Sequence, residues 1–344
     1  EILSGLVGSE MCIRDRYRTV AIALSGDVGF YSGARKLIDL LDGDVQVICG
    51  ISSVVYFMAK IGLSWDDARI VSAHGRDCNL IALIRHNPKV FSILGTEDGV
   101  ARLASRLVAY GMGDVTLYVG ENLSYENEKI FHASAAELTE YRGDALSVVT
   151  ACNEKALPLP AVHGICDEEF LRGKAPMTKE EVRTVSLSKL RLQEDSVCYD
   201  VGAGTGSVSV EMALRAWKGQ IYAIEKKEDA LALLKENRRK FATDNLEIVP
   251  GTAPEAMAEL PVPTHAFIGG SSGNMNEIIR LLLDKNPGVR IVINCITLET
   301  VTEAMNAIRD FGLTDVDIVQ LSAARSKSIG RYHMMMGELS LIHI

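Results

Sequence analysis

The sequence is short of the features that mark a metal centre, a secreted disulfide scaffold or a membrane protein. None of its seven cysteines forms a CxxC pair, which argues against a cysteine-based zinc or redox site. No apolar run approaches the roughly 18 residues that a membrane helix needs, and no secretory signal pattern is present. We therefore expect a cytoplasmic protein with reduced thiols, no bound metal and no membrane partner.

Positive charge is also scarce. The formal net charge is -9, whereas proteins that bind nucleic acid usually have a basic balance, because phosphate contacts supply much of the affinity. A nucleic acid partner is therefore not expected, although a local basic patch remains compatible with the composition. The chain has 344 residues, 47% of them hydrophobic, which is enough for two domains with separate cores.

The ends and the middle of the chain lack regular periodicity. Both ends read as foreign sequence and are excluded from the fold prediction. Pro158, Pro160 and the lapse in apolar pattern around them indicate an interdomain linker. The predicted segments are a foreign leader over 1–16, a first domain over 17–150, a linker over 151–163, a second domain over 164–338 and a foreign tail over 339–344.

Apolar strands alternate with helical patterns in both domains, which indicates an α/β architecture. The last two predicted strands lack an intervening helix and predict an antiparallel pair at the end of an otherwise parallel sheet. Strands are predicted over 19–24, 45–49, 90–94, 115–119, 145–150, 196–201, 220–225, 246–249, 266–268, 290–295, 315–321 and 331–336. Helices are predicted over 34–41, 179–190, 208–216, 227–241, 274–283 and 298–310.

The strongest functional signal is a glycine loop in the second domain. Residues 200–206 read DVGAGTG, after an apolar strand and directly before a helix. Glycines permit a tight turn and close backbone approach to a ligand, and this edge of a parallel sheet is where such folds bind ligands. A dinucleotide loop reads GxGxxG, but here the third glycine comes one residue early and Ser207 takes the expected glycine position.

The carboxylates around this loop favour S-adenosylmethionine over a dinucleotide. Asp200 would repel a pyrophosphate but can approach the cationic methionine moiety, and Glu225 is placed to accept hydrogen bonds from ribose hydroxyls. An adenine would rest at Thr252 and Ala253, after the third strand. An NAD site and a purely structural glycine turn remain as alternatives. The predicted contacts of the loop and its flanks are Asp200, Gly202, Ala203, Gly204, Thr205, Gly206, Glu225, Thr252 and Ala253.

Several runs in the second domain resemble one family. These are GICDEEF at 164–170, GKAPMTK at 173–179, FIGGS at 267–271, NCITLE at 294–299 and GRYHM at 330–334. Together they resemble the precorrin C15-methyltransferase (decarboxylating) family. The resemblance implies S-adenosylmethionine contacts at Thr178, at the glycine loop, at Glu225 and at Ala253.

The first domain resembles the C5-methyltransferases of the tetrapyrrole methylase family, through SGDVGFY at 25–31, GISS at 50–53, LSWDDA at 63–68 and GENLS at 120–124. The fused order is similar to the precorrin-6Y C5,15-methyltransferase (decarboxylating) family. That family opens with a strand and a GxGPG-type loop that this sequence lacks. We therefore expect a truncated tetrapyrrole methylase domain followed by a class I Rossmann-like methyltransferase domain with a terminal antiparallel hairpin. The first-domain contacts with S-adenosylmethionine implied by the resemblance are Gly26, Asp27, Phe30, Ser52 and Ser53, although such pairs also occur in plain turns.

The resemblance implies methylation of precorrin-6Y or cobalt-precorrin at C5 and C15, with decarboxylation of the C12 acetate, in cobalamin biosynthesis. Such a substrate carries many carboxylates, which arginine binds best because its fork is bidentate. His333 and Tyr332 are candidates for substrate contact or proton transfer, against the alternative of satisfied strand side chains. The candidate substrate-binding residues are Arg172, Lys174, Lys179, Arg183, Arg325, Lys327 and Arg331.

Two other functions stay open. One methyltransferase fold serves many acceptors, so RNA or protein is an alternative substrate. The second alternative is a non-catalytic first domain that serves as a docking platform for the macrocycle. The resemblance also implies a homo-oligomer. The sequence does not decide whether cobalt is already in the ring.

Overall fold

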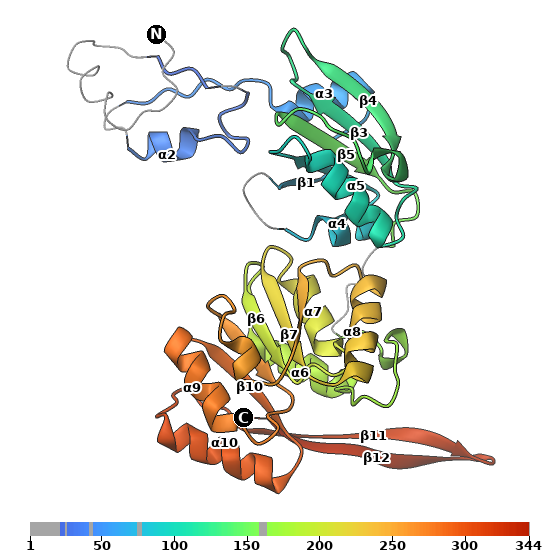
Figure 1. Cartoon of the computed structure of the whole chain (residues 1–344), viewed down its shortest axis with the longest axis vertical. Helices are drawn as coiled ribbons and strands as arrows, with labels where there is room; N and C mark the ends of the chain where they lie inside the picture. The colour runs from blue at the N-terminus through green and yellow to red at the C-terminus, as the bar shows by residue number, and fades with distance from the viewer. Residues whose placement is uncertain (1–20, 25, 41–43, 74–77, 158–163, 344) are drawn as a thin grey trace.

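The computed structural model describes residues 21–24, 26–40, 44–73, 78–157 and 164–343. They form two α/β bodies, each built around one sheet, and a long hairpin that leaves the second body (Figure 1). Within these residues, no helix is long and apolar enough to cross a membrane. The predicted α/β class is confirmed.

The first body is built around a five-stranded mixed sheet. Its strands are β1 (Arg69–Ser72), β2 (Lys89–Ile93), β3 (Thr116–Glu121), β4 (Lys129–Ser134) and β5 (Ser147–Cys152). Its helices are α2 (Ala34–Ile38), α3 (Ser53–Ile61), α4 (Leu80–His86) and α5 (Gly99–Ala109). The strand order is β1-β2-β5-β3-β4, and only β1 and β2 pair in parallel. Strand β5 continues two residues past the predicted end of the domain.

Two strands predicted near the start of the first domain are wrong. Residues 21–24 and 45–49 form no strand, while the start of the first prediction, like the leader and residues 158–163, lies outside the described residues. Ile48 is 78% exposed, and α2 stands apart from the five-stranded sheet (Figure 1). An apolar run becomes a strand only where a neighbour supplies backbone groups to pair with and a surface to pack on.

The second body is built around a seven-stranded sheet in the order β11-β12-β10-β9-β6-β7-β8. Its strands are β6 (Val197–Val201), β7 (Gln220–Glu225), β8 (Leu246–Pro250), β9 (His265–Ile268), β10 (Arg290–Cys295), β11 (Val319–Ile329) and β12 (Tyr332–His343). Its helices are α6 (Glu180–Leu190), α7 (Ser207–Arg215), α8 (Glu228–Lys240), α9 (Met275–Lys285) and α10 (Leu298–Asp310). Strands β6 to β10 pair in parallel.

Helices cover both faces of this sheet, as expected for the predicted Rossmann-like domain. One apolar cluster joins the sheet to α9 and α10, and another joins it to α6, α7 and α8. Burial on both faces explains why the parallel strands read as continuous apolar runs. Acidic residues open α8 and basic residues close it, which is the polarity that the helix dipole favours.

The terminal hairpin, β11 with β12, forms a long arm (Figure 1). The predicted antiparallel pair is confirmed, but it is longer than predicted and includes residues 339–343, which the fold prediction excluded. Among the described residues, β10 pairs with β12 only through Asn294 and Cys295, at His343 and Ile342. The arm is therefore joined to the sheet at its base and projects beyond the carboxyl edge of the sheet.

The two bodies meet through polar contacts at the start of α4. The Asn79 side-chain amide donates to Asn245 Oδ1 at 2.8 Å, and the Asn79 backbone N–H donates to the Trp217 carbonyl at 2.9 Å. Arg106 forms an ion pair with Asp244. Both asparagine side chains are buried, so these bonds fix a specific contact between the domains.

Candidate cofactor site

The glycine loop follows β6 at the carboxyl edge of the second sheet. Gly202 and Gly204 have φ of +76° and +56°, which favours glycine. A Cβ at Gly204 would lie 2.6 Å from the Pro176 carbonyl oxygen, and one at Gly202 would lie 2.9 Å from the Gly270 carbonyl oxygen. The loop is therefore packed between the turn after β9 and the segment of residues 164–179, here called the lead-in.

Glu225, at the end of β7, shapes this loop. Its Oε2 accepts the Gly204 backbone N–H at 2.9 Å, and its Oε1 accepts the backbone N–H groups of Lys226 and Lys227, both at 2.9 Å. The side chain is only 8% exposed. A carboxylate has more lone pairs than these three bonds use, so Glu225 keeps acceptor capacity for a ligand hydroxyl.

Asp200 is the buried carboxylate at the base of the loop. Its side chain is 1% exposed, and its Oδ2 accepts a hydrogen bond from the Ser209 hydroxyl. Burial raises its pKa to about 7, the charge of Glu225 adds to the rise, and the Ser209 hydrogen bond opposes it. Among the described residues, neither Asp200 Oδ1 nor the buried Thr205 Oγ1 has a hydrogen-bond partner.

These two atoms test which ligand group the site fits. Buried polar atoms are normally paired, and a buried carboxylate is costly without a cation or donor. A cationic ligand group would supply the partner of Asp200 Oδ1. The donor set therefore fits S-adenosylmethionine, whose methionine end is cationic.

The turn after β8 also belongs to this site. The Gly251 N–H donates to the Glu225 carbonyl at 2.9 Å, which places Thr252 and Ala253 beside the glycine loop's carboxylate. The Ala253 carbonyl accepts the Asn274 side-chain amide at 2.9 Å. The structure thus brings the predicted loop, ribose and adenine positions together at one edge of the sheet.

The lead-in covers the glycine loop through a residue that the sequence analysis missed. The Asn237 side-chain amide donates to the carbonyls of Leu171, at 3.1 Å, and Thr205, at 2.9 Å. Its Oδ1 accepts the Leu171 N–H at 2.8 Å. Asn237 lies on the buried face of α8 with Ala230 and Leu234. An asparagine at a core-facing helical position was the available signal, because buried amides need partners.

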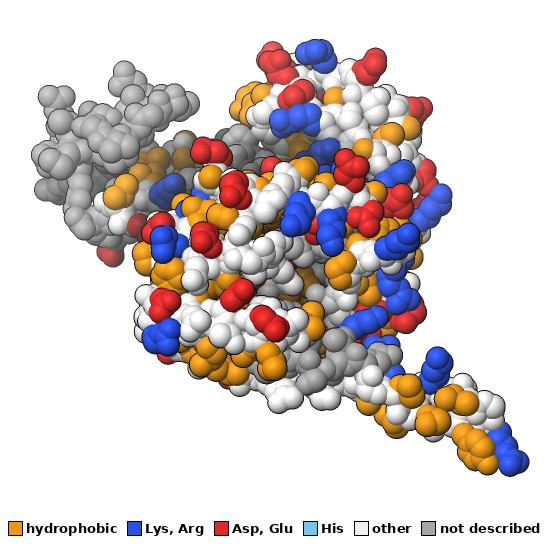
Figure 2. All heavy atoms as spheres, turned by 60° about the horizontal axis from the view of Figure 1, so that its bottom comes forward, with side chains coloured by type: hydrophobic (Ala, Val, Ile, Leu, Met, Phe, Trp, Pro, Cys, Tyr) orange, Lys and Arg blue, Asp and Glu red, His pale blue; other side chains and the backbone are white. Residues whose placement is uncertain are grey.

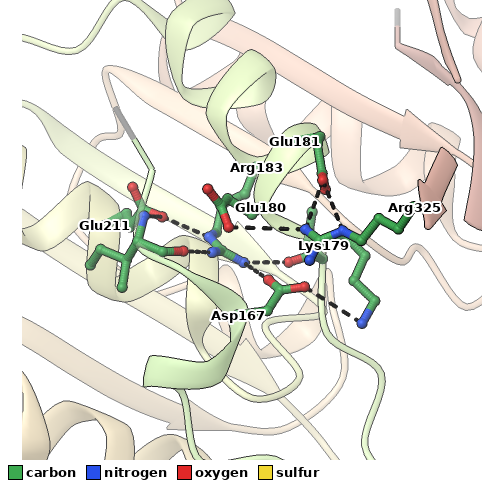
Figure 3. A network of polar contacts seen from close by, with 9 residues as sticks. Asp167, Lys179, Glu180, Glu181, Arg183, Glu211 and Arg325 are labelled. Atoms are coloured by element: carbon green, nitrogen blue, oxygen red, sulfur yellow. Dashed lines mark hydrogen bonds and ion pairs between the residues drawn. The ribbon is translucent and has the colours of Figure 1, made fainter. Parts of the chain in front are cut away.

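One candidate substrate-binding residue is contradicted. Arg183 is 0% exposed and bonds Glu211 Oε1 at 2.6 Å and Asp167 Oδ1 at 3.1 Å (Figure 3). A guanidinium enclosed in this way does not face a substrate. Arg183 is buried because it pairs with a glutamate 28 residues away in the sequence. The positive charge of Arg183 alone does not reveal this pairing.

The other basic candidates remain accessible to different degrees. Arg325, on the arm, donates to Glu181 Oε1 from Nε at 3.1 Å and from its terminal nitrogen at 2.7 Å (Figure 3). Lys179 pairs with Asp167 at 3.5 Å. Arg172 and Lys174 are exposed on the lead-in, and Lys327 is exposed on the arm.

The candidate catalytic pair lies far from the glycine loop. Tyr332 pairs with Ile329 at the turn of the arm, and it is 64% exposed. The base of the arm is at Ile342, so at ~3.3 Å per residue the tip lies about 30 Å beyond it. Within one chain, Tyr332, His333 and the neighbouring Arg331 are not brought to the loop.

The predicted first-domain contacts lie on two adjacent turns. The turns hold Gly26, Asp27 and Phe30 on one side and Ser52 and Ser53 on the other. A Cβ at Gly50 would lie 2.2 Å from the Gly26 carbonyl oxygen, so the turns touch. Ser52 caps α3 by accepting the Val55 N–H at 3.4 Å. The structure brings these residues together, and the side chains of Asp27 and Ser52 also stabilise the turns themselves.

Two family models match the chain. The precorrin methyltransferase domain matches residues 169–343, and the tetrapyrrole (corrin/porphyrin) methylases match residues 12–139. Among the described residues, no group of three or more His, Cys, Asp or Glu could hold a metal ion.

Individual curated proteins and solved structures are similar to parts of the chain. A probable cobalt-precorrin-6B C(15)-methyltransferase (decarboxylating) of Pyrobaculum calidifontis is 44% identical over 51% of this chain and 91% of its own length. A precorrin-6Y C(5,15)-methyltransferase (decarboxylating) of Sinorhizobium is 27% identical over 90% of this chain and 76% of its own length. A crystal structure of precorrin-6Y C5,15-methyltransferase from Geobacter metallireducens is 38% identical over 52% of this chain and 96% of its own, with a TM-score of 0.49. The chain belongs to the precorrin methyltransferase family.

Proposed function

We propose that this chain is an S-adenosylmethionine-dependent C-methyltransferase that acts on a reduced tetrapyrrole, a precorrin-6Y or cobalt-precorrin, in cobalamin biosynthesis. The second domain, residues 164–338, would methylate C15 and remove the carboxyl group of the C12 acetate. The first domain, residues 17–150, would methylate C5, with residues 151–163 as the linker. The observation that carries the proposal is the unpartnered buried oxygen of Asp200 beside the glycine loop, within the region matched by the precorrin methyltransferase family.

Each part of the site has a role in holding the cofactor. When bound, S-adenosylmethionine supplies a methyl group already activated on a sulfonium. Asp200 Oδ1 would balance the cationic methionine end, and Glu225 would accept from the ribose hydroxyls. Thr252 and Ala253 would flank the adenine, and Thr178 would close the site from the lead-in. In the first domain, the two touching turns that carry Gly26, Asp27, Phe30, Ser52 and Ser53 would hold a second cofactor.

The reaction needs orientation more than acid–base chemistry from the protein. An electron-rich carbon of the macrocycle forms a bond to the methyl carbon while the carbon–sulfur bond breaks, so correct alignment supplies much of the rate. In the decarboxylation, the bond between the side-chain carbon and the carboxyl carbon breaks and carbon dioxide leaves. The electron pair of that bond is held by an imine of the macrocycle and returns to the side-chain carbon as this carbon takes up a proton. Arg172, Lys174 and Arg325 would bind the other substrate carboxylates, which holds the ring and stabilises charge. Arg331, at the tip of the arm, would contribute only from a second copy of the chain.

Product analysis tests this proposal. The protein is incubated without oxygen with cobalt-free or cobalt-loaded precorrin and methyl-labelled S-adenosylmethionine, and the product is read by mass spectrometry. One labelled methyl gained with one carbon dioxide lost supports the activity of the second domain, and two labelled methyls support both domains. A ring returned unchanged, while S-adenosylmethionine still binds, would contradict the corrinoid substrate and direct the search to another methyl acceptor.

We also propose a homo-oligomer that covers the arm. Tyr332, Met334, Met335 and Met336 are 64%, 51%, 66% and 45% exposed, and hydrophobic side chains gather along the arm in Figure 2. Contiguous exposed apolar patches of this kind mark interaction sites, and a second copy is the commonest partner.

Light scattering after size exclusion tests this second proposal. Wild type should exceed the monomer mass, and Met335→Glu should lower the oligomer mass. Val262→Glu changes an exposed hydrophobic residue off the arm, 58% exposed, and should not. A monomeric wild type would contradict the proposal.

A further inference from the structure

Arg183 is a fully buried cation with an unusually complete set of partners. Besides its bonds to Glu211 and Asp167, its terminal nitrogens donate to the Thr178 carbonyl at 2.6 Å and to the Ile165 carbonyl. Its guanidinium also lies over the Phe170 ring, 4.7 Å from the centroid. Burying a charge is costly unless it is paired and hydrogen-bonded, so this arrangement needs a structural or functional reason.

The partners of Arg183 lie at the two ends of the lead-in. Ile165, Asp167 and Phe170 belong to its first residues, and Thr178 is next to its last. Glu211 of α7 joins the same network, since its Oε1 also accepts the Ile165 N–H at 3.0 Å. One guanidinium therefore closes residues 165–178 into a loop against α6 and α7 (Figure 3).

The middle of this closed loop lies on the glycine loop. The Pro176 carbonyl occupies the space that a side chain at Gly204 would take. Asn237 joins the backbone of Leu171 to the Thr205 carbonyl. If the two ends of the lead-in separated, the Pro176 contact and the position of Thr178 would be lost first, because Thr178 bonds Arg183 directly.

Arg183 cannot act on a ligand itself. Its side chain is 0% exposed, and its Nε and both terminal nitrogens donate to protein groups. Arg215 offers a contrast, because it bonds the same Glu211 through Oε2 at 2.9 Å but, among the described residues, forms no hydrogen bond or ion pair with the lead-in, and it is partly exposed.

We infer that Arg183 is a positioning residue that pins both ends of the lead-in and so holds it closed over the glycine loop. The inference rests on the proposed function in one respect, that the glycine loop binds S-adenosylmethionine. Loss of the pin raises the population of an open lead-in, which weakens cofactor binding while the rest of the domain stays folded. Loss of these Arg183 contacts therefore raises KM for S-adenosylmethionine more than it lowers kcat.

Trypsin supplies a direct readout of the lead-in, because Arg172 and Lys174 are exposed cleavage sites inside it. We expect Arg183→Met to speed cleavage at these sites by about tenfold or more and to weaken S-adenosylmethionine binding to a similar degree, as fits the loss of charge-assisted hydrogen bonds. Arg183→Lys should restore part of both effects. Arg215→Met is the matched control and should leave both near wild type.

Asp167→Asn provides a milder second variant if Arg183→Met does not fold. It should speed cleavage at the same sites, because it weakens the Arg183 bond at the start of the lead-in and the ion pair of Asp167 with Lys179, but leaves the other Arg183 bonds in place. A folded Arg183→Met or Asp167→Asn with wild-type cleavage and wild-type cofactor affinity would overturn the inference. So would an Arg215→Met that opens the lead-in equally. If wild type binds no S-adenosylmethionine, the proposed function fails, but the cleavage rates still test whether Arg183 holds the lead-in closed.

Discussion

The raised pKa of Asp200 makes a prediction about both stability and cofactor binding. The pKa rises from 3.8 to about 7 in the folded protein, chiefly through burial. A carboxyl group with a raised folded pKa contributes stability that is complete below about 3.8 and is lost as the pH rises through about 7. At ~1.4 kcal/mol per pH unit, the loss is on the order of 4 kcal/mol.

Asp200→Asn should therefore make the cofactor-free protein more stable at pH 8 than wild type, and about equal to it at low pH. Urea unfolding at several pH values measures this difference. The variant should also bind S-adenosylmethionine more weakly, because it removes the negative charge that faces the cation. Stability gained at the expense of function is typical of residues in binding sites.

The pH dependence of binding gives the sharper test. Below pH 7 the ionised fraction of Asp200 falls about tenfold per unit, so affinity measured by calorimetry should fall by up to the same factor, and binding should release a proton. Asp200→Asn should remove this slope. Ser209→Ala, which deletes the hydrogen bond that lowers the pKa, should move the midpoint to higher pH. An Asp200→Asn protein with wild-type affinity and wild-type slope would refute the reasoning.

Two further substitutions test other contacts. Glu225→Gln should weaken S-adenosylmethionine binding by about tenfold or more. Its amide nitrogen would face backbone N–H groups whose hydrogen bonds the carboxylate now accepts. Calorimetry measures the affinity, and an unchanged affinity would exclude Glu225 from the site. Asn79→Ala should lower the free energy of unfolding in urea by about 1–3 kcal/mol, since it breaks the contact with Asn245 and the cap of α4. Asn87→Ala is the control, because among the described residues its side chain bonds within its own domain, to the Leu83 carbonyl. Asn79→Ala should separate the unfolding transitions of the two domains and Asn87→Ala should not, so equal separation in both variants would contradict the interface.

The second domain was more predictable from sequence than the first. Its parallel strands are buried on both faces, so β7 and β10 were predicted with their observed bounds. In the first domain, β1 and β4 are edge strands of mixed polarity, each paired on one side only, and they were missed. Pairing partners decide whether an apolar run such as residues 45–49 becomes a strand, and pairing is not a local property of sequence.

The candidate site also has a part that was predicted from the sequence and a part that was not. The glycine loop, Asp200 and Glu225 follow from local spacing and were predicted together. The lead-in contacts were not, because Arg183 and Asn237 act through partners that are distant in sequence. The arm shows a third case, since its hairpin was predicted but its length and projection depend on how little of β12 pairs with β10.

The most direct test of the account compares wild type with Gly204→Val in the anaerobic product assay. A side chain at Gly204 would collide with the Pro176 carbonyl, at 2.6 Å for Cβ alone, so the variant should close the second-domain cofactor site. The account predicts that wild type adds a methyl group to the precorrin and removes one carbon dioxide, and that folded Gly204→Val returns the acetate side chain intact. A folded Gly204→Val that decarboxylates the ring as fast as wild type would contradict the assignment of this chemistry to the glycine loop.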